Sequence, residues 1–319
     1  MSSTTLSRRL LAASIAGVAA LALSGCSESA GSGESGDGAT SLGFVNGANT
    51  HFHTCLLKAV EQTAKAKGAK LYSANSKQDA GTELSNIEDM IARNVNALIV
   101  QTVNVDALEG DITKAKNAGI PIYLTSVSTE DLSDILGAAV VDLKKVGAMD
   151  AGWIERDAAG KQVQVGVVAG APGAASDLLV GGFKAALPAN AKVVANQPGM
   201  FNPAKAQDVA ENMIQAHPDL DYAFVANEEM AFAVRKAFDA AGAEDVKIVS
   251  VNGTEEGIAA VQAGTLSATV ANSAMTIGQT AVEEALALLA DKSGEKISNV
   301  PLTLVTKDNV AQAPQYCPE

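Results

Sequence analysis

The sequence predicts an α/β protein made of two doubly wound lobes, each a parallel sheet covered by helices on both faces. Short apolar runs alternate with longer amphipathic stretches, which is the pattern of strand–helix–strand units. This alternation occurs twice along the chain, and the second series begins after a predicted helix near 143–157. The length of 319 residues is about twice the usual domain size, and 47% apolar residues are enough for two cores.

The first series begins after residue 41. Its apolar runs predict strands, and its amphipathic stretches predict helices; for example, Ile87, Met90, Ile91 and Val95 recur at helical spacing. Gly68 and Gly119 end two of the helices, as C-terminal caps often do. The predicted strands are 42–45, 70–73, 97–101 and 120–125, and the predicted helices are 53–67, 81–94 and 105–118.

The second series follows a predicted helix at 143–157. Its predicted strands are 163–168, 192–195, 222–225 and 248–251, and its predicted helices are 175–187, 203–216, 228–241 and 254–263. The two halves share a pattern of elements but no detectable residue repeat. In doubly wound sheets ligands bind beyond the carboxyl ends of the strands, so the residues directly after each apolar run are the candidates for a site.

The N-terminus reads as a secretion signal. Arg8 and Arg9 precede a short apolar run, residues 10–23, and a small-residue cleavage site predicts that residues 1–25 are removed. The ending Leu-Ser-Gly-Cys resembles the bacterial lipobox, which implies lipidation of Cys26 and attachment to the outer face of the cell membrane. An ordinary signal with a chance cysteine is the alternative, and the export route stays open. Residues 26–40 are rich in Ser and Gly and predict a flexible linker.

Charge and cysteine content exclude several classes of protein. The formal net charge is −13, which disfavours nucleic acid as a partner. Three Cys and three His are too few for a zinc-ribbon array or an iron–sulfur scaffold. If Cys26 carries lipid, Cys55 and Cys317 remain as an even pair in an oxidising compartment and predict a disulfide, with two free thiols as the alternative.

Carboxamide side chains dominate the predicted strand ends, with aromatic rings beside them. An amide both donates and accepts, as an alcohol does, and a flat ring offers an apolar face to C–H groups. The pattern therefore predicts a small, neutral, polyhydroxylated ligand, although Asn is also a common turn and cap residue. The residues concerned are Asn46, Asn49, Phe52, Phe201, Asn227, Asn252 and Asn272.

Other chemistries find little support. The pair His51 and His53 lacks further His or Cys to complete a metal site, so we predict none. Residues 166–173 are Gly-rich but fit neither dinucleotide nor phosphate-loop patterns, and no G-x-S-x-G elbow occurs. The pairs Glu228-Glu229 and Glu255-Glu256 fit helix first turns, where the helix dipole favours acids. We therefore expect no cofactor and no enzymatic activity.

Five segments carry a resemblance to a known family. They are the stretch from Thr54 onward, Gly119-Ile120-Pro121-Ile122, Ala216-His217-Pro218-Asp219, Asn227-Glu228-Glu229-Met230-Ala231 and Val251-Asn252-Gly253-Thr254. Together they resemble the ribose/galactose class of periplasmic binding proteins, the solute receptors of sugar ABC importers, over roughly residues 41–310. Transcription regulators with the same fold carry an N-terminal DNA-binding headpiece. This sequence has a lipobox and a polar linker in that place, which argues against a role in regulating transcription.

The resemblance implies a periplasmic binding protein type I fold with a three-crossing hinge. Lobe 1 would comprise residues 41–141 and 274–303, and lobe 2 residues 142–273 and 304–319. The crossings would lie near 140–142, 272–273 and 303–305. Closure of the hinge on a solute would present a composite surface to a membrane permease, and we expect a monomer. A sensory receptor feeding a signalling partner would share these features and is the alternative.

The family's ligand-binding positions carry over residue by residue. The matching positions are Asn49, His51, Phe52, Phe201, Asn227 and Asn272. Three positions depart from the family pattern: its Asp-Arg pair reads Ser126-Val127, an Arg falls on Asp177, and an Asp has become Asn252. These departures favour another pentose, a hexose or a linear polyol over ribose, while Asp177 leaves an amino-bearing solute open.

Overall fold

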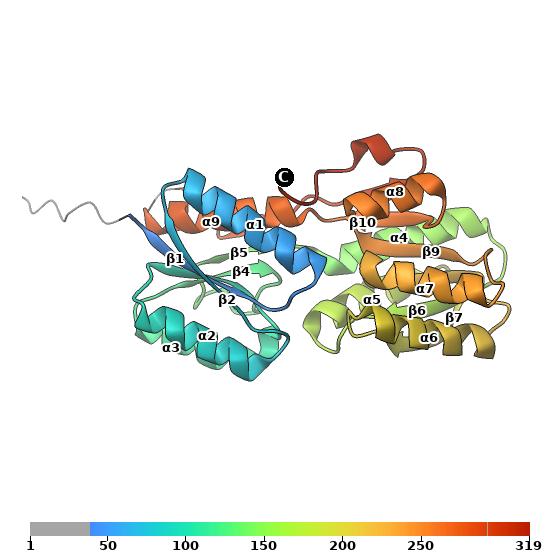
Figure 1. Ribbon diagram of the computed structural model, residues 1–319, viewed down its shortest axis with the longest axis horizontal. Helices are drawn as coiled ribbons and strands as arrows, with labels where there is room; N and C mark the ends of the chain where they lie inside the picture. Colours follow the sequence, from blue (N-terminus) through green and yellow to red (C-terminus); the bar gives the residue numbers. More distant parts are fainter. Residues whose placement is uncertain (1–38, 292) are drawn as a thin grey trace, which may run out of the picture. The chain divides into compact units, whose positions relative to one another are not determined.

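The computed structural model describes residues 39–291 and 293–319 of the chain. The predicted signal peptide, the lipidation site Cys26 and most of the predicted linker lie outside the described residues. Residues 39–319 form one compact unit. Within this unit the strands form two separate six-stranded sheets, so the predicted two-lobed α/β fold is confirmed (Figure 1).

The sheet of lobe 1 has the strand order β11-β5-β4-β3-β1-β2, and all its pairings are parallel. Helices α1 and α9 pack together, as do α2 and α3. The elements are β1 (Ser41–Asn46), α1 (His51–Ala66), β2 (Lys70–Asn75), α2 (Ala80–Ala92), β3 (Ala97–Gln101), η1 (Val105–Ala107), α3 (Glu109–Asn117), β4 (Ile122–Ser126), β5 (Gly137–Val140), α9 (Ala274–Leu289) and β11 (Ile297–Asn299).

The sheet of lobe 2 repeats this arrangement in the order β12-β10-β9-β8-β6-β7. Its helices also pack in pairs, α4 with α5 and α6 with α7. The elements are α4 (Leu143–Ala158), β6 (Val163–Ala169), α5 (Ala174–Ala186), β7 (Ala191–Pro198), α6 (Pro203–Ala216), β8 (Tyr222–Val225), α7 (Glu228–Ala240), β9 (Lys247–Asn252), α8 (Glu255–Ala263), β10 (Ala268–Ala271), β12 (Thr303–Thr306) and η2 (Val310–Gln312).

The structure departs from the sequence prediction at the sheet edges. β12 pairs with β10 in the antiparallel sense, so lobe 2 is not a purely parallel sheet. The short strands β5 and β11 have too few residues to give a periodic signal of their own. An antiparallel edge strand is common on doubly wound sheets, because the chain can enter the edge from either end.

The chain passes between the lobes at residues 141–142, 272–273 and 300–302. The third crossing lies a little before the expected 303–305, because β12 already belongs to the sheet of lobe 2 from Thr303 onward. The last residues also depart from the expected boundary. Cys317 is joined to Cys55 on α1, so the C-terminal residues contact lobe 1 as well as lobe 2, where the Cys317 N–H donates to Oε1 of Glu255 at 3.4 Å.

The predicted amphipathic helices bury the faces that their sequences mark as apolar. In α1 the buried positions Cys55, Leu56, Ala59 and Val60 recur at helical spacing. One core cluster runs from lobe 1 into lobe 2 and includes the crossing residue Val141. Among the described helices, none combines the length and apolar character needed to cross a membrane.

Candidate ligand site

A cavity of about 790 Å³ lies between the two lobes. Lobe 1 contributes η1, α3 and the residues after β4, while lobe 2 contributes the first turns of α4 and α5. Two of the predicted site residues line it, Ser126 and Asp177. The other predicted residues are not among its lining, so this cavity covers only one part of the predicted site.

Ser126 ends β4 in the left-handed backbone region, with φ of 65°. Its Oγ donates to Oε1 of Gln101 at 2.9 Å, and the Thr125 Oγ1 donates to the same oxygen at 2.7 Å. Gln101 is the last residue of β3 and is buried. It therefore fixes the carboxyl ends of β3 and β4 relative to each other. Gln101 was missed by sequence reasoning, although its place directly after a buried apolar run is the signal that could have found it.

The β1–α1 segment carries four predicted site residues. Asn46 is buried at the end of β1, and its Nδ2 donates to the backbone oxygen of His53 at 2.8 Å, which fixes the start of α1. The Asn46 Oδ1 has no hydrogen-bond partner within residues 39–291 and 293–319. Asn49 is exposed, whereas His51 and Phe52 are half-buried in the first turn of α1.

The two histidines of this segment have different environments. His53 packs its ring edge-on to Phe52, and its Nδ1 lies 2.9 Å from Oγ1 of Thr50. Burial lowers the pKa of His53 to about 4, so its ring is neutral at physiological pH. His51 instead faces lobe 2, where its backbone N–H donates to Oε1 of Glu229 at 3.3 Å.

One arrangement of potential metal ligands also involves His51. Donor atoms of His51, Glu255 and Glu256 lie within 4.8 Å of one another, and both glutamates are exposed. His53 does not belong to this group, so the two histidines do not form half of one metal site. The prediction that the chain has no metal site stays a prediction.

In lobe 2, Phe201 lies against the carboxyl end of β6. A Cβ on Gly170 would sit 2.1 Å from the Phe201 ring, so only glycine at this position lets the ring lie there. Asn227 is buried, and its Oδ1 accepts from the backbone N–H of Met230 at 3.0 Å, capping α7. Its oxygen is thus used as a helix cap, and its Nδ2 remains the group that can meet a ligand.

Asn252 and Asn272 lie side by side at the ends of β9 and β10. The backbone N–H of Asn272 donates to the backbone oxygen of Asn252 at 3.0 Å. Asn272 is buried, and its Oδ1 lacks a hydrogen-bond partner in the part of the chain that the structure describes. Asn252 is half-buried with a φ of 129°, a backbone conformation that L-residues rarely adopt.

Glu228 holds the Asn252 loop in this conformation. Its Oε1 accepts from the Gly253 N–H at 2.9 Å and from the Thr269 hydroxyl at 2.6 Å, and its Oε2 accepts from the Thr254 N–H at 2.8 Å. Burial raises the pKa of the Glu228 carboxyl, while these hydrogen bonds lower it in part. The sequence prediction treated Glu228 as an ordinary first-turn acid, and no signal distinguishes it from its neighbour Glu229.

The fold and this arrangement define a two-lobed receptor with polar and aromatic groups at the facing edges of two sheets. Residues 42–295 match the family model described as periplasmic binding protein domain. The chain is 31% identical over 264 residues to the ribose import binding protein of Bacillus subtilis (strain 168), with 82% of this chain and 86% of that protein covered. The chain belongs to the periplasmic binding protein family.

Two further relatives show the range of the family. The xylitol-binding protein of Mycolicibacterium smegmatis is 26% identical over 265 residues, covering 81% of this chain and 75% of that protein. The solved structure of the arabinose ABC transporter binding component from Shewanella sp. ANA-3, bound to L-arabinofuranose, superposes with a TM-score of 0.80 at 27% identity and covers 86% of this chain and 94% of that chain. The chain is thus an extracytoplasmic substrate-binding protein of the ABC-importer class and not an enzyme, as its sequence predicted.

Proposed function

We propose that the protein captures a neutral monosaccharide or sugar alcohol between its lobes. The observation that carries this proposal is the set of amide groups at the strand ends, of which the Asn46 and Asn272 oxygens lack a hydrogen-bond partner among the residues described. Buried amides without a partner are costly, and sugar hydroxyls are donors that would satisfy them. The ring of Phe201 offers a flat apolar face beside them.

The proposed mechanism is hinge closure on the solute. A ligand that touches both lobes binds the closed form better than the open form and shifts the population toward it. Asn49, His51 and Phe52 would act from lobe 1, and Phe201, Asn227 and Asn252 from lobe 2. A micromolar solute supplies about −8 kcal/mol, which is small enough to allow release to a permease.

The test is isothermal calorimetry against ribose, allose, arabinose, xylitol and inositol. We expect one of these to bind with micromolar affinity and to raise the melting temperature. Asn227→Asp is the sharpest variant, because aspartate also caps a helix and so preserves the start of α7 while removing the Nδ2 donor. A binding solute whose affinity is the same for Asn227→Asp and wild type would remove Asn227 from the site.

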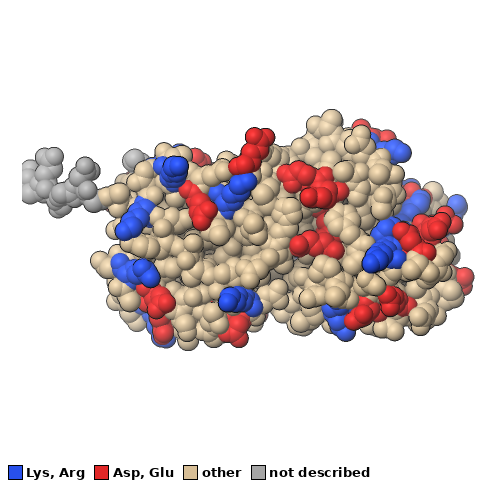
Figure 2. Space-filling view, in the orientation of Figure 1, with Lys and Arg blue, Asp and Glu red and all other residues tan. Residues whose placement is uncertain are grey.

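An amino-bearing solute is the second candidate, and the charge of the interlobe cavity favours it. Asp106, Glu109, Glu130 and Asp177 line the cavity, with Lys144 as the basic residue beside them. Acidic side chains also lie beside the boundary between the lobes in Figure 2. Such a lining attracts cations and is indifferent to neutral sugars. Adding an amino sugar and a polyamine to the calorimetry distinguishes the two candidates.

The remaining parts of the proposal concern the membrane. We propose that Cys26 carries lipid and holds the protein at the outer face of the cell membrane, and that the closed form docks as a monomer on an ABC permease. The Ser- and Gly-rich linker would allow the compact unit to reach the permease while it stays tethered. Metabolic labelling with a fatty acid should mark the wild type and not Cys26→Ser.

A further inference from the structure

The C-terminal tail, residues 313–319, returns from lobe 2 to lobe 1. The preceding elements belong to lobe 2, because β12 pairs with β10 and η2 packs against α8. The tail then runs to α1 and to the N-terminus of α9, both in lobe 1, and the chain end in Figure 1 lies beside these helices. The tail is therefore a fourth connection between the lobes, in addition to the three crossings of the hinge.

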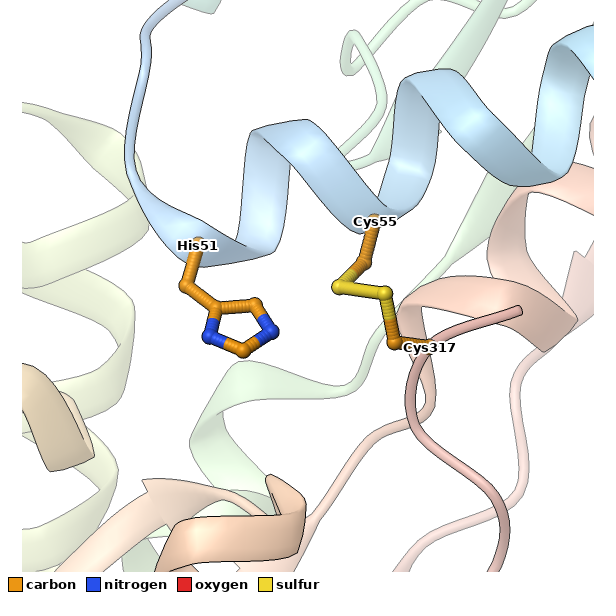
Figure 3. A group of neighbouring side chains, drawn as sticks. All are labelled: His51, Cys55 and Cys317. Carbon is orange, nitrogen blue, oxygen red and sulfur yellow. A yellow bond between two sulfur atoms is a disulfide. The ribbon is translucent and has the colours of Figure 1, made fainter. Parts of the chain in front are cut away.

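The tail is fixed to α1 of lobe 1 by a covalent bond and by hydrogen bonds. Cys317 forms a disulfide with Cys55, at a sequence separation of 262 (Figure 3). Further along α1, the Lys58 Nζ donates to the Pro318 backbone oxygen, and the Gln62 Nε2 donates to the Glu319 backbone oxygen at 3.0 Å. These contacts follow one face of α1.

The same tail is bound to the second hinge crossing. Ser273, which lies in that crossing and caps α9, donates its hydroxyl to the Gln315 backbone oxygen. The Met275 N–H donates to the Tyr316 backbone oxygen at 2.9 Å. The tail is therefore held by α1 and by the second hinge crossing, and residues 313–314, which join it to η2 of lobe 2, must accommodate any movement of the hinge.

Tyr316 brings the tail to the edge of the candidate ligand site. Its side chain is 1% exposed and packs with Cys55 and Ala274. Its ring lies edge-on to the ring of His51, with 5.8 Å between the centroids. Its hydroxyl has no hydrogen-bond partner among residues 39–291 and 293–319. Burial raises the pKa of this hydroxyl, and the carboxylates of Glu228, Glu229 and Glu255 raise it further.

We propose that the disulfide-bound tail is a positioning element of the solute site: it restrains the opening of the hinge and holds His51 in place through Tyr316. This proposal rests on the solute-binding function proposed above. Only Ala313 and Pro314 lie between η2 and Gln315, so the chain from Gln312 to Gln315 can span at most roughly 11 Å even when fully extended. This length permits closure of the lobes and limits how far they can separate.

Release of the tail should weaken solute binding. A freed tail allows more open conformations, so the binding-competent fraction of the protein falls and the apparent Kd rises by the same factor. We expect roughly a threefold to tenfold rise in Kd on reduction, as for a modest population shift. Reduction by a dithiol transfers two electrons and two protons to the pair, which yields the two thiols and the cyclic disulfide of the reagent.

The experiment uses the full-length chain with Cys26→Ser, so that Cys55 and Cys317 are its remaining cysteines. Calorimetry with a sugar that binds compares the oxidised protein with the protein reduced by dithiothreitol. The matched control is Cys55→Ser with Cys317→Ser, which should show the weaker affinity with and without reductant. Equal affinity of the oxidised and reduced protein, with the fold intact by circular dichroism, would overturn the proposal.

Two further measurements separate the possible failures. Tyr316→Ala, with the disulfide intact, should lower affinity through loss of the contact with His51, whereas Tyr316→Phe keeps the ring and should bind like wild type. Small-angle scattering of the solute-free protein needs no ligand, and its radius of gyration should increase on reduction. A radius of gyration that is the same before and after reduction would refute the restraint on the hinge, whether or not any sugar binds. If the radius increases on reduction but no sugar binds, the proposed class of solute is refuted instead.

Discussion

Glu228→Gln should destabilise the protein and weaken solute binding, because glutamine cannot accept all the hydrogen bonds that the carboxylate accepts. Each carboxylate oxygen of Glu228 accepts from one backbone N–H and one threonine hydroxyl. The amide NH₂ of glutamine must face one of these pairs. The threonine hydroxyl of that pair can rotate to accept instead, but the backbone N–H of Gly253 or Thr254 is left buried without an acceptor.

The expected magnitude follows from that single unpaired group. A buried donor without a partner costs about 1–3 kcal/mol. For a chain of this size, the loss corresponds to a decrease of roughly 2–8 °C in melting temperature. Because Asn252 directly precedes Gly253, we also expect a several-fold rise in Kd for the solute that the wild type binds.

The assay is thermal unfolding followed by circular dichroism, with calorimetry on the same samples. Glu229→Gln is the matched control, since this neighbouring side chain is half-buried and accepts one N–H at 3.3 Å. It should melt within about 1 °C of the wild type, as surface substitutions usually do. A Glu228→Gln protein as stable as Glu229→Gln would refute the argument that Glu228 holds the β9–α8 loop.

Three further outcomes are expected. Phe201→Ala should weaken sugar binding by about 1–3 kcal/mol in calorimetry, because a large aromatic face is lost, while the protein remains folded. Gly170→Ala should also weaken binding, since its Cβ would displace the Phe201 ring, whereas Gly181→Ala, with open space around it, should bind like wild type. Burial raises the pKa of the Asp150 carboxyl well above its usual range. A carboxyl whose pKa is higher in the folded than in the unfolded protein stabilises the fold at low pH. This stabilisation is complete below the unfolded-state pKa and is lost as the pH rises through the folded-state pKa. Melting curves between about pH 4 and about pH 9 should therefore show Asp150→Asn gaining on the wild type as pH rises, and a constant difference would contradict this.

The sequence predicted the larger elements well because their signals are local. Helix α6, for example, extends over Pro203–Ala216, the same residues that the sequence indicated, with Asn202 as its cap and Pro203 at its first turn. The strand after Gly119 begins later than predicted, at Ile122 rather than residue 120. Proline lacks the N–H that a ladder needs, and Pro121 therefore lies before the strand.

The sequence predicted which residues follow the strands, and their binding of a solute stays a prediction. The carboxamides do lie at strand ends, but the sequence could not divide their hydrogen bonds between structure and ligand. Asn227 uses its oxygen as a cap, and Asn46 uses its amide to hold α1, so each has only part of its capacity left for a solute. Which hydrogen bonds of an amide are used within the protein depends on the backbone groups that lie near it in the fold. The spacing of residues along the chain does not predict these neighbours.

The two lobes hold their strand ends with different hydrogen-bond acceptors, a neutral amide in lobe 1 and a carboxylate in lobe 2. This difference affects which part of the site can change its specificity. In lobe 1 the neutral acceptor Gln101 takes two hydroxyl donors, and in lobe 2 the carboxylate of Glu228 takes backbone N–H groups as well as hydroxyls. Removing a hydrogen-bond partner from a buried charge costs more than removing one from a buried neutral amide. The end of β4, including Ser126, is therefore the part of the site that can change with least cost to the fold. Ser126 also stands where the resemblance places a charged pair in the family, so substitutions at the β4 end are the expected route by which this site would exchange one hydroxylated solute for another.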